Sequence, residues 1–188
     1  GTGISLAPEK NGYEEDPELK NYKDKFSVKY IDLLDNNDLR KSSSEINAPA
    51  KFDFVHSGCF INHNIGNLDK TRDLYKNSYE IAFRNLREGG DFLNLLSFKW
   101  DENLLLDTIE LLSHHFDTIT LYKDPDYTAG LSIVFIGCHK YRNNLDNDLM
   151  KKYCAGRIWQ NETLNKYRNA INNVFLVMNQ HHIKLISS

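Results

Sequence analysis

Two side chains that could do chemistry adjoin at the end of a short apolar run, where His56 precedes Ser57. A histidine base beside a serine nucleophile is the arrangement that many hydrolases use. Adjacent residues of a strand point to opposite faces, however, and the G-x-S-x-G elbow is absent because Val55 replaces its first glycine. The sequence therefore argues against a serine hydrolase.

Cysteine and histidine approach each other at two places, Cys59 with His63 and Cys138 with His139. Neither spacing matches a zinc pattern and no second pair completes a ligand set, so we predict no metal site. The chain has three cysteines, and an odd number of widely spaced cysteines favours a reducing compartment over a disulfide framework. We therefore expect a cytoplasmic location.

A cation stands beside an aromatic ring at Lys99 and Trp100, directly after the apolar run 92–98. Such a pair can contact an RNA phosphate and stack on a base, which predicts an RNA contact; the alternative is a tryptophan that packs on the following helix. Asp32 and Asp35 end another predicted strand, where they either flank a cofactor or solvate the strand end.

Helices that could position these residues are indicated by apolar residues at three- and four-residue spacing. Gly89-Gly90 is predicted to end the first helix, because glycine adopts the left-handed C-cap conformation without strain. Asp101 can cap the second. The predicted helices are 69–88, 102–115, 144–154 and 161–184.

The strands are indicated by β-branched and apolar runs, and they are predicted at 3–6, 26–34, 52–55, 92–98, 118–122 and 131–138. The link from Lys123 to Gly130 is too short for a helical crossover. We therefore predict that 131–138 runs antiparallel to its neighbours and lies between 92–98 and 118–122. Alternating strands and helices indicate a doubly wound, Rossmann-like α/β sheet that ends in an antiparallel hairpin.

The composition is that of an ordinary globular domain, with 40% hydrophobic and 26% charged residues in 188. A formal net charge of −3 argues against a strongly basic nucleic-acid module, although a local basic patch is compatible with it. No apolar run reaches the roughly 18–20 residues that cross a bilayer, and no signal peptide is recognised.

The helix ending "LREGG", the strand after it, the next helix and the final hairpin resemble the C-terminal half of class I S-adenosylmethionine-dependent methyltransferases. The likeness is greatest to the FtsJ-like RNA ribose 2′-O-methyltransferases, which include viral mRNA cap enzymes. "GTGISL" resembles the family's second strand, "KYIDLLD" its third, and "FDFVHSGCF" the strand that ends in Asp-Gly. The resemblance covers residues 1–142, and residues 143–188 are predicted to form a C-terminal helical extension.

The resemblance implies a catalytic Lys-Asp-Lys-Glu tetrad, of which three positions can be placed. The aspartate falls on Ser57, the strand lysine on Leu95, and the glutamate on or near Gly130. All three positions have lost the ionisable group, and the first lysine would lie upstream of residue 1. Lys99 shares a face with Leu95 but lies four residues on, roughly 13 Å at about 3.3 Å per residue, so it is out of reach. The resemblance thus implies that the family's scaffold is present and its reaction centre is not.

The resemblance also implies binding of S-adenosylmethionine, with Gly3, Asp32, Asp35, Ser57 and Gly58 near the cofactor. The family's glycine-rich loop and first strand would precede residue 1, which leaves a gap one strand wide between 3–6 and 52–55. We expect an upstream segment, a partner chain, or direct pairing of these two strands to complete the sheet.

The resemblance therefore implies an RNA cap methyltransferase-like domain of viral kind, without catalysis of its own. It would serve as scaffold, partner or RNA-binding subunit of a capping or replication complex in the host cytoplasm. Two alternatives stay open: an active S-adenosylmethionine-dependent RNA methyltransferase whose cofactor-binding half lies upstream, and an unrelated α/β nucleotide-binding protein.

Overall fold

A computed structural model describes residues 2–5, 27–35, 51–58, 68–98, 101–124 and 132–187. The chain divides into two compact units, Gly1–Ala48 and Pro49–Ser188. The helices after residue 143 lie within the second unit, and the domain boundary predicted at residue 142 stays a prediction.

The first unit contains a pair of short parallel strands, β1 (Thr2–Ser5) and β2 (Ser27–Tyr30), aligned with Thr2 opposite Ser27. The strand predicted at 26–34 is shorter than expected, because a turn begins at Asp32. The Asp32 carboxylate accepts a hydrogen bond from the backbone N–H of Leu34 at 3.0 Å, and the Asp32 carbonyl accepts one from Asp35 N–H at 3.0 Å.

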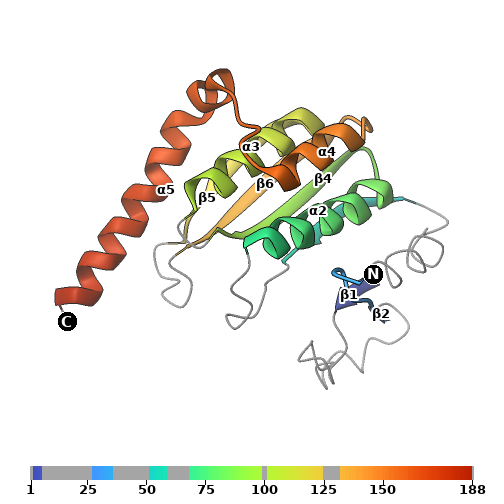
Figure 1. Ribbon diagram of the computed structural model, residues 1–188, viewed down its shortest axis with the longest axis horizontal. Helices are drawn as coiled ribbons and strands as arrows, with labels where there is room; N and C mark the ends of the chain where they lie inside the picture. The colour runs from blue at the N-terminus through green and yellow to red at the C-terminus, as the bar shows by residue number, and fades with distance from the viewer. Residues whose placement is uncertain are drawn as a thin grey trace. The chain divides into compact units, whose positions relative to one another are not determined.

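The second unit is built on a four-stranded sheet in the order β3-β4-β6-β5 (Figure 1). β3 and β4 are parallel, whereas β6 is antiparallel to β4 on one side and to β5 on the other. The predicted hairpin arrangement is therefore confirmed. The strands are β3 (Phe52–Ser57), β4 (Leu86–Ser97), β5 (Phe116–Tyr122) and β6 (Ile133–Tyr141).

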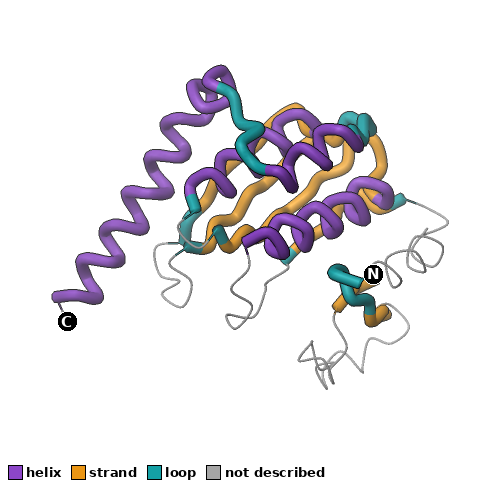
Figure 2. The backbone as a smooth tube through the Cα atoms, in the orientation of Figure 1, coloured by secondary structure: helices purple, strands orange, loops and turns teal. Residues whose placement is uncertain are grey.

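Helices lie over one face of this sheet, and the colouring by secondary structure in Figure 2 separates them from the strands behind. α2, α3 and α4 form this layer, while α5 contacts β5 and α3. The mixed α/β class predicted from the sequence is confirmed. The helices are α2 (Leu68–Asn85), α3 (Glu102–His115), α4 (Asn147–Ala155) and α5 (Asn161–Ser187). None of the described helices is long and apolar enough to cross a membrane.

Aromatic rings fill the space between the helices and the sheet. Phe83 of α2 packs edge-on against Phe92 of β4 with ring centroids 5.6 Å apart, and Tyr79 meets the same ring at 5.9 Å. The apolar residues that recur at three- and four-residue spacing in these helices are largely buried, among them Tyr79 of α2, Ile109 of α3 and Ile171 of α5. The predicted cap is also confirmed, since the Asp101 carboxylate accepts from the N–H groups of Asn103 and Leu104.

The prediction that the double glycine ends the first helix is wrong. α2 ends at Asn85, and β4 already begins at Leu86, which pairs with Phe52 of β3. Both glycines lie inside β4 at a register shift, where Gly89 has φ +73° and Gly90 approaches the β3 backbone. Long-range pairing with β3 therefore overrides the local glycine signal.

Candidate functional site

The carboxyl ends of β3 and β4 are the natural place for a site, because ligands of open α/β sheets bind where parallel strands end. Two positions to which the resemblance assigns catalysis lie here. Ser57 is the last residue of β3, and Leu95 lies near the end of β4. Ser57 is aligned with Asn94, one residue before Leu95.

The Ser57 hydroxyl does not face solvent. The side chain is 5% exposed, and its Oγ lies 2.5 Å from Oγ of Ser78 on α2. His56 is exposed and points to the opposite face of β3. The structure therefore bears out the argument against a serine–histidine pair.

Leu95 instead approaches Gly58, just past the end of β3. A Cβ atom placed on Gly58 would lie 3.8 Å from Leu95 Cδ2 and 3.4 Å from His56 Cε1. The fold thus brings Gly58, the residue after one tetrad position, close to Leu95, the other tetrad position. An isobutyl group stands where the resemblance requires an ammonium group, and it cannot take a proton from a ribose hydroxyl.

A buried polar layer lies behind this edge, between β3, β4 and α2. Asn94 is fully buried and its Nδ2 donates to the Tyr79 hydroxyl at 2.9 Å, while its Oδ1 has no hydrogen-bond partner. An unpaired buried acceptor costs about 1–3 kcal/mol. Asn94 was not predicted as a site residue, although a lone amide in the apolar run "FLNLLSF" is a recognisable signal.

Lys123 was also missed, and it lies at the same edge of the sheet, just after β5. Its side chain is only 6% exposed, and burial lowers its pKa, an effect that nearby Asp124 partly opposes. Two inter-strand steps of about 4.8 Å put β5 roughly 10 Å from β4. Lys123 therefore does not replace the group absent at Leu95.

The structure does not place the remaining predicted site residues at this edge of the sheet. Lys99, Trp100 and Gly130 lie outside the described residues. Gly3 lies in β1, and Asp32 and Asp35 lie in the turn after β2, all in the first unit. Their assignments stay predictions.

The described residues at this edge do not by themselves form a site for S-adenosylmethionine. Ser57 is turned into the protein toward α2, and Gly58 lies against the His56 ring and the Leu95 side chain. The Asp32 carboxylate caps its own turn. In the part of the chain that the structure describes, no three metal-ligating side chains gather either.

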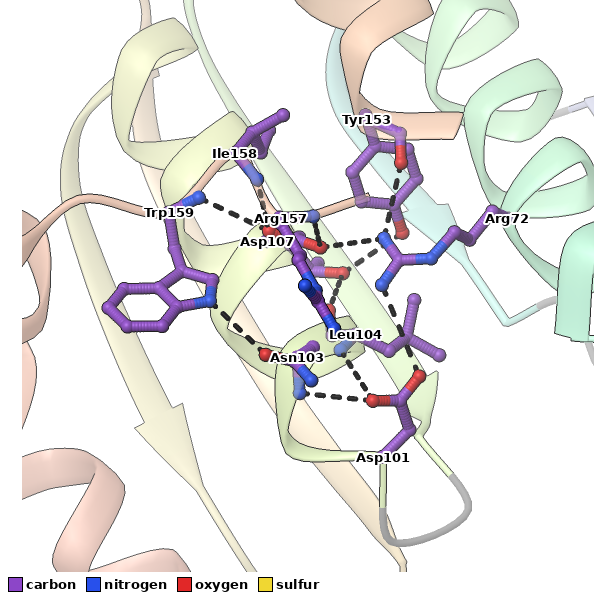
Figure 3. A network of polar contacts seen from close by, with 10 residues as sticks. Arg72, Asp101, Asn103, Leu104, Asp107, Tyr153, Arg157, Ile158 and Trp159 are labelled. Carbon is purple, nitrogen blue, oxygen red and sulfur yellow. Dashed lines mark hydrogen bonds and ion pairs between the residues drawn. The ribbon is translucent and has the colours of Figure 1, made fainter. Parts of the chain in front are cut away.

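A second cluster of charged groups lies within the helix layer, centred on Asp107 of α3 (Figure 3). This carboxylate is completely buried and pairs with Arg72 of α2 at 2.8 Å. Its two oxygens also accept from the backbone N–H groups of Arg157 at 2.8 Å, Ile158 at 2.6 Å and Trp159 at 3.1 Å.

The same cluster ties the α4–α5 connection to the rest of the helix layer. The Arg72 guanidinium donates to the Tyr153 carbonyl at 3.1 Å and lies 5.5 Å from the centre of the Tyr153 ring. Gly156 and Arg157 both have positive φ angles, which turn successive N–H groups toward Asp107. Because both carboxylate oxygens are engaged by the chain itself, this cluster is structural and not a ligand site.

Similarity to known proteins is found among solved structures. No protein-family profile and no curated protein matches the chain. Among solved structures, the chain is similar to a protein of Plasmodium falciparum described as a ribosomal RNA methyltransferase, with 15% identity and a TM-score of 0.46. The match covers 62% of this chain and 64% of that one, less than two thirds of its length. A likeness this distant carries no functional argument, and the proposals below depend on the chain's own residues.

Proposed function

We propose that this chain is a methyltransferase-like domain that contributes an RNA-associated surface or scaffold and does not itself catalyse methyl transfer. Its setting would be a capping or replication complex, of viral kind, in the host cytoplasm. The observation that carries the proposal is the strand order β3-β4-β6-β5, with an antiparallel strand between β4 and β5. This is the arrangement that the sequence resemblance implies.

The chemistry of the site edge supports a non-catalytic role. Proton removal from a ribose hydroxyl needs a base within hydrogen-bond reach. Leu95 is apolar. The Ser57 hydroxyl lies against Ser78 of α2, on the face of the sheet opposite to that of Leu95. S-Adenosylmethionine, if bound, would supply the methyl group, but we assign no step to it because the described residues do not form its site.

A methyl-transfer assay tests this proposal directly. The 188-residue chain is incubated with radiolabelled S-adenosylmethionine and either capped or uncapped RNA, and we expect no incorporation above a heat-treated control. Turnover that Lys99→Ala abolishes would overturn the proposal and favour an active enzyme.

The RNA contact is tested through tryptophan fluorescence, because the chain has only two tryptophans, Trp100 and Trp159. Trp159→Phe removes a residue whose Nε1 donates to Asn103 Oδ1 at 3.3 Å and leaves Trp100 as the reporter. We expect short single-stranded RNA to quench this signal, and added salt to weaken the binding. Lys99→Ala should weaken it further, whereas Lys151→Ala, an exposed lysine on α4, serves as the matched control.

A further inference from the structure

The end of α3 and the start of α4 meet at His115, whose side chain is completely buried. Its Nδ1 lies 2.7 Å from the Leu111 carbonyl oxygen, and its Nε2 lies 3.3 Å from the backbone nitrogen of Asp146. A carbonyl oxygen can only accept a hydrogen bond, and a backbone N–H can only donate one. Nδ1 therefore carries the proton, Nε2 accepts, and the two contacts together hold the ring in its neutral form.

Asp146 connects this histidine to α4. Its backbone N–H donates to His115, while its carboxylate accepts from the N–H groups of Asp148 at 3.0 Å and Leu149 at 2.9 Å. The Asp146 carbonyl accepts from the Met150 N–H at 3.0 Å, which closes the first turn of the helix. The residue that caps α4 is thus anchored on α3 by a single hydrogen bond to an imidazole.

Charged groups from neighbouring elements face the same place. Arg142, directly after β6, pairs with Asp117 of β5 at 2.8 Å and donates to the His114 carbonyl at 3.1 Å. The exposed His114 ring lies 3.6 Å from the Asp146 carboxylate. The Leu149 N–H holds the pKa of that carboxyl below its ordinary value, so Asp146 stays an anion down to acidic pH.

Neutral rings pack beside His115 in the core. The Phe83 ring of α2 lies 4.9 Å from it between centroids, and Tyr141 of β6 packs on Phe83 at 5.4 Å. Burial raises the pKa of Tyr141 to about 12, so this phenol keeps its proton at neutral and acidic pH. Burial also lowers the pKa of His115, which agrees with a ring held neutral by its two contacts.

A proton added at Nε2 would set two donors against each other. The charged ring and the Asp146 N–H cannot share a hydrogen bond, whereas the Asp146 carboxylate is the acceptor that an imidazolium favours. To reach Nε2, that carboxylate has to leave the N–H groups of Asp148 and Leu149, and α4 then loses its cap. An open hollow borders this place, so solvent reaches it; its lining consists of His114 and residues 144–148.

We propose that His115 and Asp146 form a proton-sensitive joint, which is closed while the ring is neutral and opens the segment 142–149 when Nε2 takes up a proton. The far end of α4 would stay in place, because Arg72 donates to the Tyr153 carbonyl at 3.1 Å. This inference goes beyond the proposed function, since it concerns a conformational change within the helix layer and needs neither RNA nor a methyl donor.

Hydrogen exchange measured by NMR tests this inference on the 188-residue chain. Rates are expressed as protection factors, which removes the intrinsic effect of pH on exchange. The amides of Asp148 and Leu149 should exchange through a local opening that low concentrations of urea do not change. Their protection should be about tenfold lower at pH 5.5 than at pH 7.5, because the opened His115 regains its ordinary pKa of 6.5 and each pH unit below it adds a factor of about ten.

Amides at the other end of α4 provide the internal reference. The N–H groups of Arg157 and Ile158 donate to the buried Asp107 carboxylate, so they should exchange only through global unfolding, which urea promotes. If the amides of Asp148 and Leu149 show the same protection and the same urea dependence as these two at both pH values, no local joint exists and the inference is overturned.

Substitution of each histidine separates the joint from a general effect of acid. His115→Gln should remove the tenfold difference, whereas His114→Gln, at the exposed neighbour, should retain it. A local opening that does not depend on pH, or whose pH dependence survives His115→Gln, would overturn the inference. The ring nitrogens of the unsubstituted protein give a test that needs no variant: a proton on Nε2 at pH 7.5 would contradict the closed joint. None of these measurements depends on RNA binding or methyl transfer.

Discussion

At the residue scale, Asp107 is the side chain that joins α3 to α2 and to the connection between α4 and α5. It holds Arg72 and three consecutive backbone N–H groups while completely buried. Removing one partner of a buried ion pair costs about 3–5 kcal/mol, because the other charge is left without compensation. Asp107→Asn should therefore lower the free energy of unfolding by about 3 kcal/mol in urea denaturation.

A matched control lies one helical turn further along α3. Glu110 accepts a hydrogen bond from the Gln160 N–H at 3.1 Å, but it is partly exposed. Glu110→Gln should cost less than about 1 kcal/mol, the usual range for exposed interactions. Equal costs for the two substitutions would show that the buried pair is not the anchor of the α4–α5 connection.

His115 predicts a pH dependence of stability. It is fully buried, its Nδ1 donates to the Leu111 carbonyl at 2.7 Å, and its Nε2 accepts from Asp146 N–H at 3.3 Å. Burial lowers its pKa from 6.5, assisted by His114 and Arg142, whereas the Leu111 carbonyl and Asp146 act in the opposite direction. The ring is therefore neutral in the folded protein.

Because the folded pKa is depressed, the unfolded chain binds more protons below pH 6.5. Stability should be fully present above that pH and fall as the pH drops toward the folded pKa. Urea denaturation at pH 7.5 and 5.5 measures the loss, and His115→Gln should reduce it. An unchanged pH dependence in this variant would assign the effect to groups other than His115.

At the element scale, Gly90 of β4 lies close against the backbone of β3. A Cβ atom there would lie 2.8 Å from Leu86 Cδ1 and 2.9 Å from the Asp53 carbonyl oxygen. The backbone of β3 would have to move, so Gly90→Ala should cost about 1–3 kcal/mol, as overpacking usually does. Chemical denaturation measures this loss.

Gly89 provides the contrast, because nothing lies within 4 Å of its Cβ position and only its φ of +73° restricts substitution. Asparagine tolerates that conformation better than other residues. Gly89→Asn should therefore cost clearly less than Gly90→Ala. The reverse order would mean that backbone strain, and not the approach of the two strands, explains why this bulge contains glycine.

Elements were predictable where local signals and tertiary packing agree. The helix 102–115 was predicted to the residue, because Asp101 caps it and its leucines share one face. The antiparallel hairpin followed from the length of one link. The end of α2 was not predictable, because β4 starts at Leu86 through pairing with a strand 34 residues away in sequence, Phe52. The contacts of Asn94 and Asp107 were not predictable either, because their hydrogen-bond partners come from distant segments of the chain.

At the scale of the whole molecule, the two units differ in what holds them together. The continuous core consists of residues from 75 to 178, together with Val55 and other partly buried side chains packed against it, and it lies wholly within Pro49–Ser188. The described part of the first unit contains two parallel strands, each of four residues. Two-stranded sheets are at best marginally stable in water.

A chain comprising residues 49–188 should therefore unfold cooperatively, with a Tm close to that of the 188-residue chain, because truncation leaves the core intact. Residues 1–48 alone should show no cooperative transition. Calorimetry measures the first and circular dichroism the second. In the truncated chain β3 should exchange its amides faster than β4 and β6, since β3 has one neighbour in the sheet whereas those strands have two. If removal of residues 1–48 abolishes cooperative unfolding, the first unit contributes to the stability of the second, and the core around α2, α3 and α5 is not sufficient by itself.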